Sequence, residues 1–306
     1  MQVSPARYRQ VAYAALVVCT LIVFTGAAVR LTGSGLGCPD WPRCHGNHLT
    51  PELKIHGLIE FGNRVMTGIV GIPCLAAAIF AWFRRPFRRD LALIALLLPL
   101  GVLGQAVMGG LTVIYGLAPG WVIGHFLLSM ALLVACVALV WRASHEPGER
   151  PAATDRLGTW AVRLLLVPGA VTLAAGTLAT AAGPHAGGEG TGDEVVRLTW
   201  RGADTLDWAI HQHGALATFL GLSLVGVWFL ARARHLNATT QNALTAACVL
   251  VACQGLVGSA QYALELPAEI VWFHVMLSAL TWLALLFATA AAGRLAPVRD
   301  RKLVSA

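Results

Sequence analysis

Charged residues are scarce in this chain. Asp, Glu, Lys and Arg make up 12% of its 306 residues, whereas 57% are hydrophobic. A soluble domain carries about twice that charged fraction, so the composition excludes a soluble globular fold. The formal net charge is +7, but the basic residues lie in short scattered turns, and we expect no nucleic-acid partner.

Long apolar runs dominate the sequence. Eight of them approach the roughly 20 residues that an α-helix needs to cross a bilayer. The first run has no small-residue cleavage site behind it, which favours a membrane span over a removable signal peptide. The sequence therefore predicts an all-α polytopic membrane protein, embedded in lipid, with spans at 10–29, 59–82, 91–113, 121–141, 159–181, 208–231, 241–262 and 269–291.

Lysine and arginine lie mainly on one side of these spans. That side holds the Arg84–Arg89 turn, both chain ends and the segment 142–156, whereas few basic residues lie on the other side. The positive-inside rule then predicts a cell-membrane protein with both termini in the cytoplasm.

The second half of the chain repeats the first at an offset of about 150 positions. Because each half holds four spans, the repeats share one orientation and are related by an axis along the membrane normal. We expect two tandem four-helix bundles, residues 1–148 and 156–306, joined by a polar, Pro-rich linker at 144–151. The matched residues are Gly26, Gly33 and Gly37 with Gly176, Gly183 and Gly187; Gln105 and Gly109 with Gln254 and Gly258; and His125 and Ser129 with His274 and Ser278.

Two of the seven cysteines differ from the others in position. Cys38 and Cys44 flank a segment with two prolines in the first outside loop, whereas the other five lie within spans and are expected to be small buried hydrophobic residues. An oxidising compartment and the short separation favour a disulfide. A metal-binding pair is the alternative, but the second outside loop supplies no partner cysteines.

The second span opens with a polar stripe. On a helix, His56, Glu60, Asn63 and Arg64 share one face. Such a face cannot meet lipid, so it must look into the bundle. Glu60 and Arg64 can be an i,i+4 ion pair that only lines the bundle, but an acid one turn inside the membrane favours a functional role.

Histidines occupy matching places in the later even-numbered spans. His125 lies in the fourth span and His274 in the eighth. In the sixth span, His211 and His213 point about 200° apart on a helix and cannot share one metal. The repeat aligns His213 with Asn63. The sequence thus predicts two pairs of polar residues in the outer third of the membrane. Asn63 pairs with His125, and His213 pairs with His274.

Two neutral imidazoles that face each other across a four-helix bundle can be the axial ligands of heme iron. A single histidine in a span is more often a hydrogen-bonded packing residue, but a pair that a repeat reproduces favours a cofactor. The repeated Gln105 and Gln254 can hydrogen-bond a ligand histidine or a heme edge. Among loop histidines, His185 is the candidate to approach a cofactor.

These motifs resemble the heme A synthase family, eight-span membrane enzymes built from two four-helix halves. The resemblance covers almost the whole chain and rests on residues 30–42, 60–64 and 183–187 and on the contexts of His213 and His274. The family oxidises the C8 methyl of heme O to a formyl group by successive hydroxylations, which gives heme A for terminal oxidases. The resemblance implies this reaction here, with heme O synthase and an external electron donor or acceptor as partners.

The resemblance also implies roles for single residues. His213 and His274 would bind a heme b cofactor, His125 would belong to the substrate-heme site and Glu60 would be catalytic. The cysteine pair would matter outside the membrane. Arg64, one turn after Glu60, would keep that acid ionised or pair with a heme propionate.

Position 63 departs from the family pattern. Many members have histidine where this chain has Asn63. Asparagine is a poor iron ligand, so the substrate heme would be held by His125 alone, or together with His56 from one turn before Glu60.

Two other functions account for part of the pattern. A non-enzymatic diheme b-type electron carrier would need two histidines in each half and hemes staggered across the bilayer. A transporter with parallel repeats would break its spans near mid-membrane, and the prolines within the spans do not repeat. The chain has no nucleotide-binding fingerprint and no soluble donor domain, so electrons must pass through heme and external partners.

Overall fold

The computed structural model describes residues 2–149, 152–153 and 155–295, and these residues are almost entirely helical. Arg150 and the basic residues after position 295, which served above to predict the orientation, lie outside the described residues. Pro151 of the predicted linker lies outside them too. The elements are α1 (Pro5–Leu31), α2 (Ile55–Phe83), α3 (Arg89–Ile114), α4 (Pro119–Ser144), β1 (Ala152–Ala153), α5 (Arg156–Leu164), α6 (Leu166–Ala182), the 3-10 turn η1 (Gly202–Asp204), α7 (Thr205–Ala233), α8 (Ala238–Ala263), α9 (Ala268–Ala291) and β2 (Arg294–Leu295).

The eight predicted spans are confirmed. Eight helical stretches in the described part of the chain are long and apolar enough to cross a membrane. The helices begin one to five residues earlier than the apolar runs, and at α1 and α8 a polar residue caps the earlier start. Ser4 accepts a hydrogen bond from the Arg7 amide ahead of α1, and Asn237 accepts one from the Thr240 amide ahead of α8.

The fifth span is a kinked pair of helices, α5 and α6, that meet at Leu165. Pro168 lies one turn later, and its ring lacks an N–H and clashes with the carbonyl four residues before it, at Leu164. Pro73 and Pro99 also lie inside helices, but α2 and α3 continue through them. The predicted span at 159–181 is therefore present with one break.

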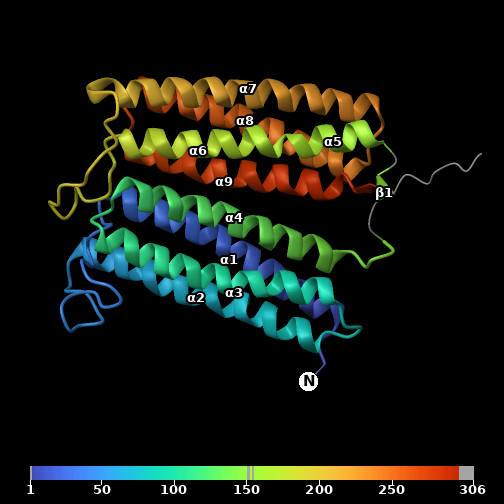
Figure 1. The fold of residues 1–306 in the computed structure, drawn as a ribbon, viewed down its shortest axis with the longest axis horizontal. Helices are drawn as coiled ribbons and strands as arrows, with labels where there is room; N and C mark the ends of the chain where they lie inside the picture. Colours follow the sequence, from blue (N-terminus) through green and yellow to red (C-terminus); the bar gives the residue numbers. More distant parts are fainter. Residues whose placement is uncertain (1, 150–151, 154, 296–306) are drawn as a thin grey trace, which may run out of the picture.

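The spans form two groups of neighbouring helices (Figure 1). In one group α1 packs against α2 and α4, and α3 packs against the same two helices. In the other group α7 packs against α6 and α8, and α8 packs against α9. The division into two halves with separate tasks and the repeat relation between them stay predictions.

The groups meet along α1, α4, α6 and α9. Two tryptophans of α9 bond across this contact to backbone carbonyls. Trp272 Nε1 donates to the carbonyl of Phe24 in α1 (2.9 Å), and Trp282 Nε1 donates to that of Met130 in α4 (3.1 Å). A buried indole needs such a partner, so these bonds fix α9 against the first group.

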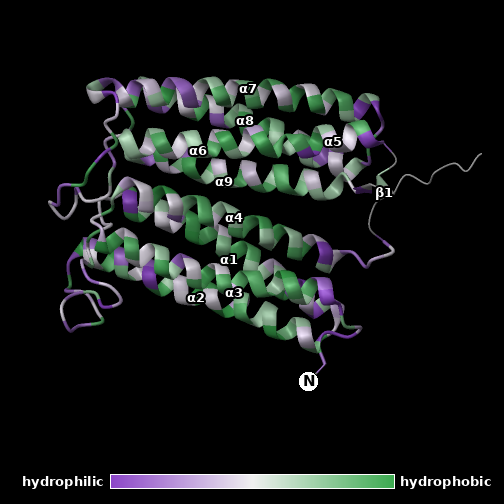
Figure 2. Cartoon of the chain, in the orientation of Figure 1, coloured by the Kyte–Doolittle hydropathy of each residue, from purple (hydrophilic) through white to green (hydrophobic). Residues whose placement is uncertain are grey.

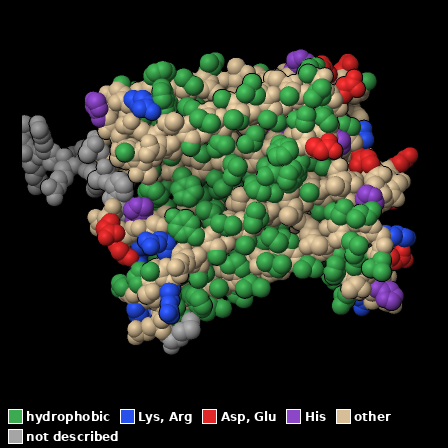
Figure 3. All heavy atoms as spheres, turned by 180° about the vertical axis from the view of Figure 1, so that it is seen from behind, with side chains coloured by type: hydrophobic (Ala, Val, Ile, Leu, Met, Phe, Trp, Pro, Cys, Tyr) green, Lys and Arg blue, Asp and Glu red, His purple; other side chains and the backbone are tan. Residues whose placement is uncertain are grey.

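The apolar surface forms a belt along the spans. Hydrophobic residues follow the helices, and hydrophilic residues gather at the helix ends and in the loops (Figure 2). The space-filling view shows the same pattern, with charged side chains at the two rims (Figure 3). One rim holds the N-terminus and the α2–α3 turn; the other holds the long loops after α1 and α6. The chain is thus built as a multi-pass membrane protein.

Candidate functional site

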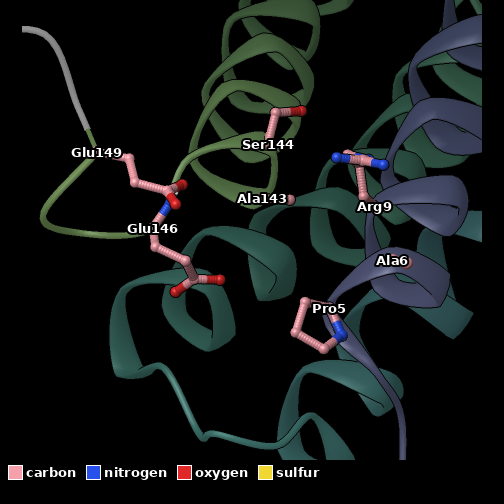
Figure 4. Close-up of a pocket in the computed structure, with 7 residues that line it drawn as sticks. All are labelled: Pro5, Ala6, Arg9, Ala143, Ser144, Glu146 and Glu149. Carbon is pink, nitrogen blue, oxygen red and sulfur yellow. Dashed lines mark hydrogen bonds between the residues drawn. The ribbon is translucent and has the colours of Figure 1, made fainter.

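The predicted site residues lie at the rim of the long loops. The opposite rim has a pocket of about 260 Å³ between the start of α1 and the end of α4 (Figure 4). None of the residues predicted from the sequence lines it; its lining is Pro5, Ala6, Arg9, Ala143, Ser144, Glu146 and Glu149. The candidate site therefore lies elsewhere.

The structure brings His213 of α7 and His274 of α9 together. Their ring centroids are 6.1 Å apart and the ring planes are inclined by 78°. A metal–imidazole bond is about 2 Å long, so two imidazoles on one metal ion have centroids about 6 Å apart. His213 Nδ1 lies 3.1 Å from the carbonyl oxygen of Thr172. That contact assigns Nδ1 as the donor and leaves Nε2 with its lone pair free.

A glycine faces each histidine ring. A Cβ added at Gly176 would lie 3.0 Å from His213 Cε1, and one at Gly258 would lie 3.2 Å from His274 Cε1. A side chain at either position would push the ring out of place. The repeated glycines thus allow the helices to approach closely at the histidines.

The first half has the same arrangement with one change. A Cβ added at Gly109 would lie 3.3 Å from His125 Cε1. At the position that matches His213, Asn63 faces Gly26, whose added Cβ would lie 4.0 Å from Asn63 Nδ2. Gln105, predicted to bond a ligand histidine, donates through Nε2 to the backbone carbonyl of His125 (3.2 Å), and also to Ser129 Oγ (2.8 Å).

Several buried polar atoms at these positions have no partner. They are Nδ1 of His125, Nδ1 of His274, Oε1 of Gln105 and Oε1 of Gln254. Buried polar groups in proteins are nearly always hydrogen-bonded, and each exception calls for a partner such as a ligand or an ion. The residues therefore fit a polar or metal-containing group held between the helices of each half.

Glu60 and Arg64 hold the first outside loop. Glu60 is 6% exposed; its Oε2 accepts from the Cys38 amide (2.8 Å), and its Oε1 accepts from Arg64 Nη2 (2.6 Å). Arg64 also donates to the carbonyls of Cys38, Asp40 and Arg43 (2.7–2.9 Å). The predicted disulfide between Cys38 and Cys44 is present. The ion pair and the disulfide together fix residues 38–44.

This loop places an aromatic ring on α3. A Cβ added at Gly110 would lie 2.6 Å from the ring of Trp41, which is 41% exposed. Gly110 adjoins Gly109, the glycine that faces His125. The loop fixed by Glu60 therefore packs an indole on α3, next to the glycine that faces His125. The sequence did not predict this contact, because Trp41 and Gly110 lie 69 positions apart and no pattern relates them.

The two glycine-rich loops interlock. The Gly35 amide donates to the Gly187 carbonyl (2.8 Å), and the Gly190 amide donates to the Gly33 carbonyl (3.1 Å). Gly33 has a φ of +64°, and a Cβ there would collide with the Gly190 backbone. His56 packs against Gly190 and bonds Ser34 Oγ through Nδ1 (2.9 Å). His56 therefore belongs to the contact between loops.

A half-buried arginine joins the two helix groups at this rim. Arg30 donates from Nε to the His185 carbonyl (2.8 Å) and from Nη2 to the Thr180 carbonyl (2.9 Å). This contact was not predicted from the sequence, although a basic residue at the outer end of a span was an available signal. His185 itself bonds the carbonyl of Leu266 through Nε2 (2.7 Å).

Glu189 caps the second loop. It accepts from the amides of Ala186 (2.7 Å) and Gly187 (2.9 Å). Burial opposes ionisation of this carboxyl, but the amide donors outweigh it and hold its pKa below the usual range. His211, by contrast, has a 63% exposed side chain that pairs with Asp207, so it lies on the surface of α7.

The fold and the site define an eight-span membrane protein whose polar residues converge at one rim of two helix groups. The chain belongs to the COX15-CtaA family, described as cytochrome oxidase assembly protein, whose family model matches residues 9–286. Together with the relatives below, this match confirms the predicted membership of the heme A synthase family.

Three relatives named heme A synthase are similar to parts of the chain. The protein of Lysinibacillus sphaericus (strain C3-41) is 34% identical over 129 residues, 42% of each chain. That of Bacillus pumilus (strain SAFR-032) is 34% identical over 134 residues, 42% of this chain and 43% of the relative. That of Bacillus cereus (strain AH187) is 29% identical over 140 residues, which are 44% of this chain and 45% of the relative. Each match spans less than half of the relative's length.

Arg64→Ala should loosen the loop at 38–44, because it removes the donor to three loop carbonyls. We expect an external reductant to open the Cys38–Cys44 disulfide about tenfold faster in the variant, as monitored by alkylation and mass spectrometry. Arg43→Ala is the matched control, since the Arg43 side chain bonds only Asn47 among the described residues. Equal rates in the wild type and Arg64→Ala would contradict this role.

Proposed function

We propose that this protein is a heme A synthase, which oxidises the C8 methyl of heme O to a formyl group by successive hydroxylations. The observation that carries the proposal is the facing pair of His213 and His274, whose 6.1 Å spacing suits one metal ion between two imidazoles. The family and the named relatives supply the substrate class.

The two halves have different tasks in this proposal. His213 and His274 would fill both axial positions of a heme b, which suits electron transfer because no coordination site stays open. His125 would hold heme O in the first half, where a single imidazole faces Asn63. Heme supplies the redox chemistry; the protein binds and orients it and limits its access to water.

Glu60 is our candidate catalytic carboxylate. It lies one turn from Asn63 on α2, beneath the loop that carries Trp41. A carboxylate there can relay a proton or stabilise positive charge near the methyl group, and an apolar side chain can do neither. Arg64 pairs with this carboxylate through a 2.6 Å contact.

The proposal includes an orientation. The rim with the N-terminus and the α2–α3 turn is rich in arginine and faces the cytoplasm, while the histidines lie toward the extracytoplasmic side of the cell membrane. Heme O would come from heme O synthase, and an external donor or acceptor would exchange electrons with the heme b.

Pigment extraction tests the function. Full-length protein, expressed in a host that makes heme O but lacks its own heme A synthase, should yield heme A on extraction and chromatography. The competing function, a diheme b-type electron carrier, would give heme B alone with no heme O or heme A. That outcome would refute the enzyme.

His213→Ala and His274→Ala should each remove the low-spin heme b, because each deletes an axial ligand. His211→Ala is the matched control, two residues from His213 but exposed, and it should keep the heme. The low-spin absorption and EPR signals per mole of protein measure the loss. Loss of heme in His211→Ala with retention in His213→Ala would show that the ligand assignment is wrong.

Glu60→Ala should retain the heme b of the second half but make less than about a tenth of the heme A, with accumulation of heme O or a hydroxylated intermediate. Glu60→Gln separates the two roles of this residue: it keeps acceptor capacity for the Cys38 amide but cannot carry a proton as a carboxylate does. Full heme A output from both variants would contradict a catalytic role for Glu60 and leave it only a structural ion pair with Arg64.

A further inference from the structure

The side chain of Asn63 is held by a specific partner. Thr25 Oγ1 on α1 donates to Asn63 Oδ1 at 2.8 Å, a shorter contact than its 3.2 Å approach to the Ile22 carbonyl. The bond fixes the amide plane and leaves Nδ2 as the free end. Nδ2 points toward Gly26, at 4.0 Å from the Cβ position of that glycine.

The second half differs at both positions of this pair. At the offset of 150, Ala175 stands where the first half has Thr25, and His213 stands where it has Asn63. The adjacent glycines, Gly26 and Gly176, are the same. Nδ2 of Asn63 thus faces Gly26 as the His213 ring faces Gly176, and the hydroxyl that orients it has no counterpart at position 175.

The end of the amide that faces Gly26 cannot ligate a metal, because an amide nitrogen has two N–H donors and no free lone pair. Oδ1 is turned toward Thr25 on α1. His56, the other residue predicted for this position, bonds Ser34 and packs against Gly190. His56 is therefore not free to replace the missing imidazole. The donor set of the first half thus does not fit two-histidine ligation.

We propose that the first half holds its heme through His125 alone, and that Thr25 fixes Asn63 as a hydrogen-bond donor toward the open axial position. This inference rests on the proposed function. An N–H donor at that place favours a small anionic guest that can accept a hydrogen bond. Asn63 and Thr25 are thus positioning residues, specific to this half, that select what occupies the sixth coordination site.

Spectroscopy of the ferric full-length protein, purified and saturated with heme O, tests the inference. We expect one high-spin and one low-spin heme in the wild type, with the high-spin signal lost in His125→Ala and the low-spin signal lost in His213→Ala. Asn63→His should convert the high-spin signal to low-spin, because it restores the second imidazole.

Fluoride and imidazole titrations then probe the donor. Asn63→Leu should weaken fluoride binding to the high-spin heme about tenfold, the effect of one lost hydrogen bond to an anion, without weakening imidazole binding. Thr25→Val should weaken fluoride binding in the same direction, by about threefold. Thr67→Val is the matched control: its hydroxyl bonds only the Asn63 backbone carbonyl, and fluoride binding should not change.

The outcomes separate this inference from the proposed function. Two low-spin hemes in the wild type, with heme A still produced, would overturn the inference and leave the function standing. A high-spin heme whose fluoride affinity does not respond to Asn63→Leu would overturn the donor role. A first half that binds no heme in any variant would overturn both.

Discussion

Close approach between helices, made possible by glycine, is the constraint on which the site depends. Gly109, Gly176 and Gly258 each lie against a histidine ring, where a Cβ would come within 3.0–3.3 Å of the ring. Without a side chain opposite it, an imidazole can lie between helices rather than point into lipid. Small residues serve helix packing in membranes generally; here they also leave room for polar rings inside the bundle.

The polar rim follows from a second constraint, the cost of a polar group without a partner away from water. Arg30 and Arg64 both meet it by donating to backbone carbonyls. Arg30 bonds those of Thr180 at the end of α6 and His185 in the loop after it, and Arg64 bonds those of the first outside loop. An arginine that bonds several carbonyls fixes the backbone that supplies them. The loops at this rim are therefore defined structures. They carry Trp41 to α3 and join the two helix groups.

Much of this arrangement could be predicted from the sequence, because it depends on local pattern. The length of the apolar runs predicts the spans, and the short separation of Cys38 and Cys44 predicts the disulfide. Contacts between distant residues could not be predicted this way. Thr25 and Asn63 lie 38 residues apart, and nothing local distinguishes Thr25 from other span threonines. The kink at Leu165 was also missed, since Pro73 and Pro99 show that a proline alone does not decide a break.

The asymmetry between the halves extends beyond position 63. At the offset of 150, Ile210 stands where the first half has Glu60, Gly214 where it has Arg64, and Gly188 and Glu194 where it has the disulfide cysteines. The acid, its cation and the loop they fix are thus all confined to the half that lacks one imidazole. A site with both axial positions filled needs rigid ligands and little else. A site that accepts a substrate needs an open position, a charge beside it and a cover against water. In the proposed function the first half would combine these features, whereas the second would keep only the paired histidines.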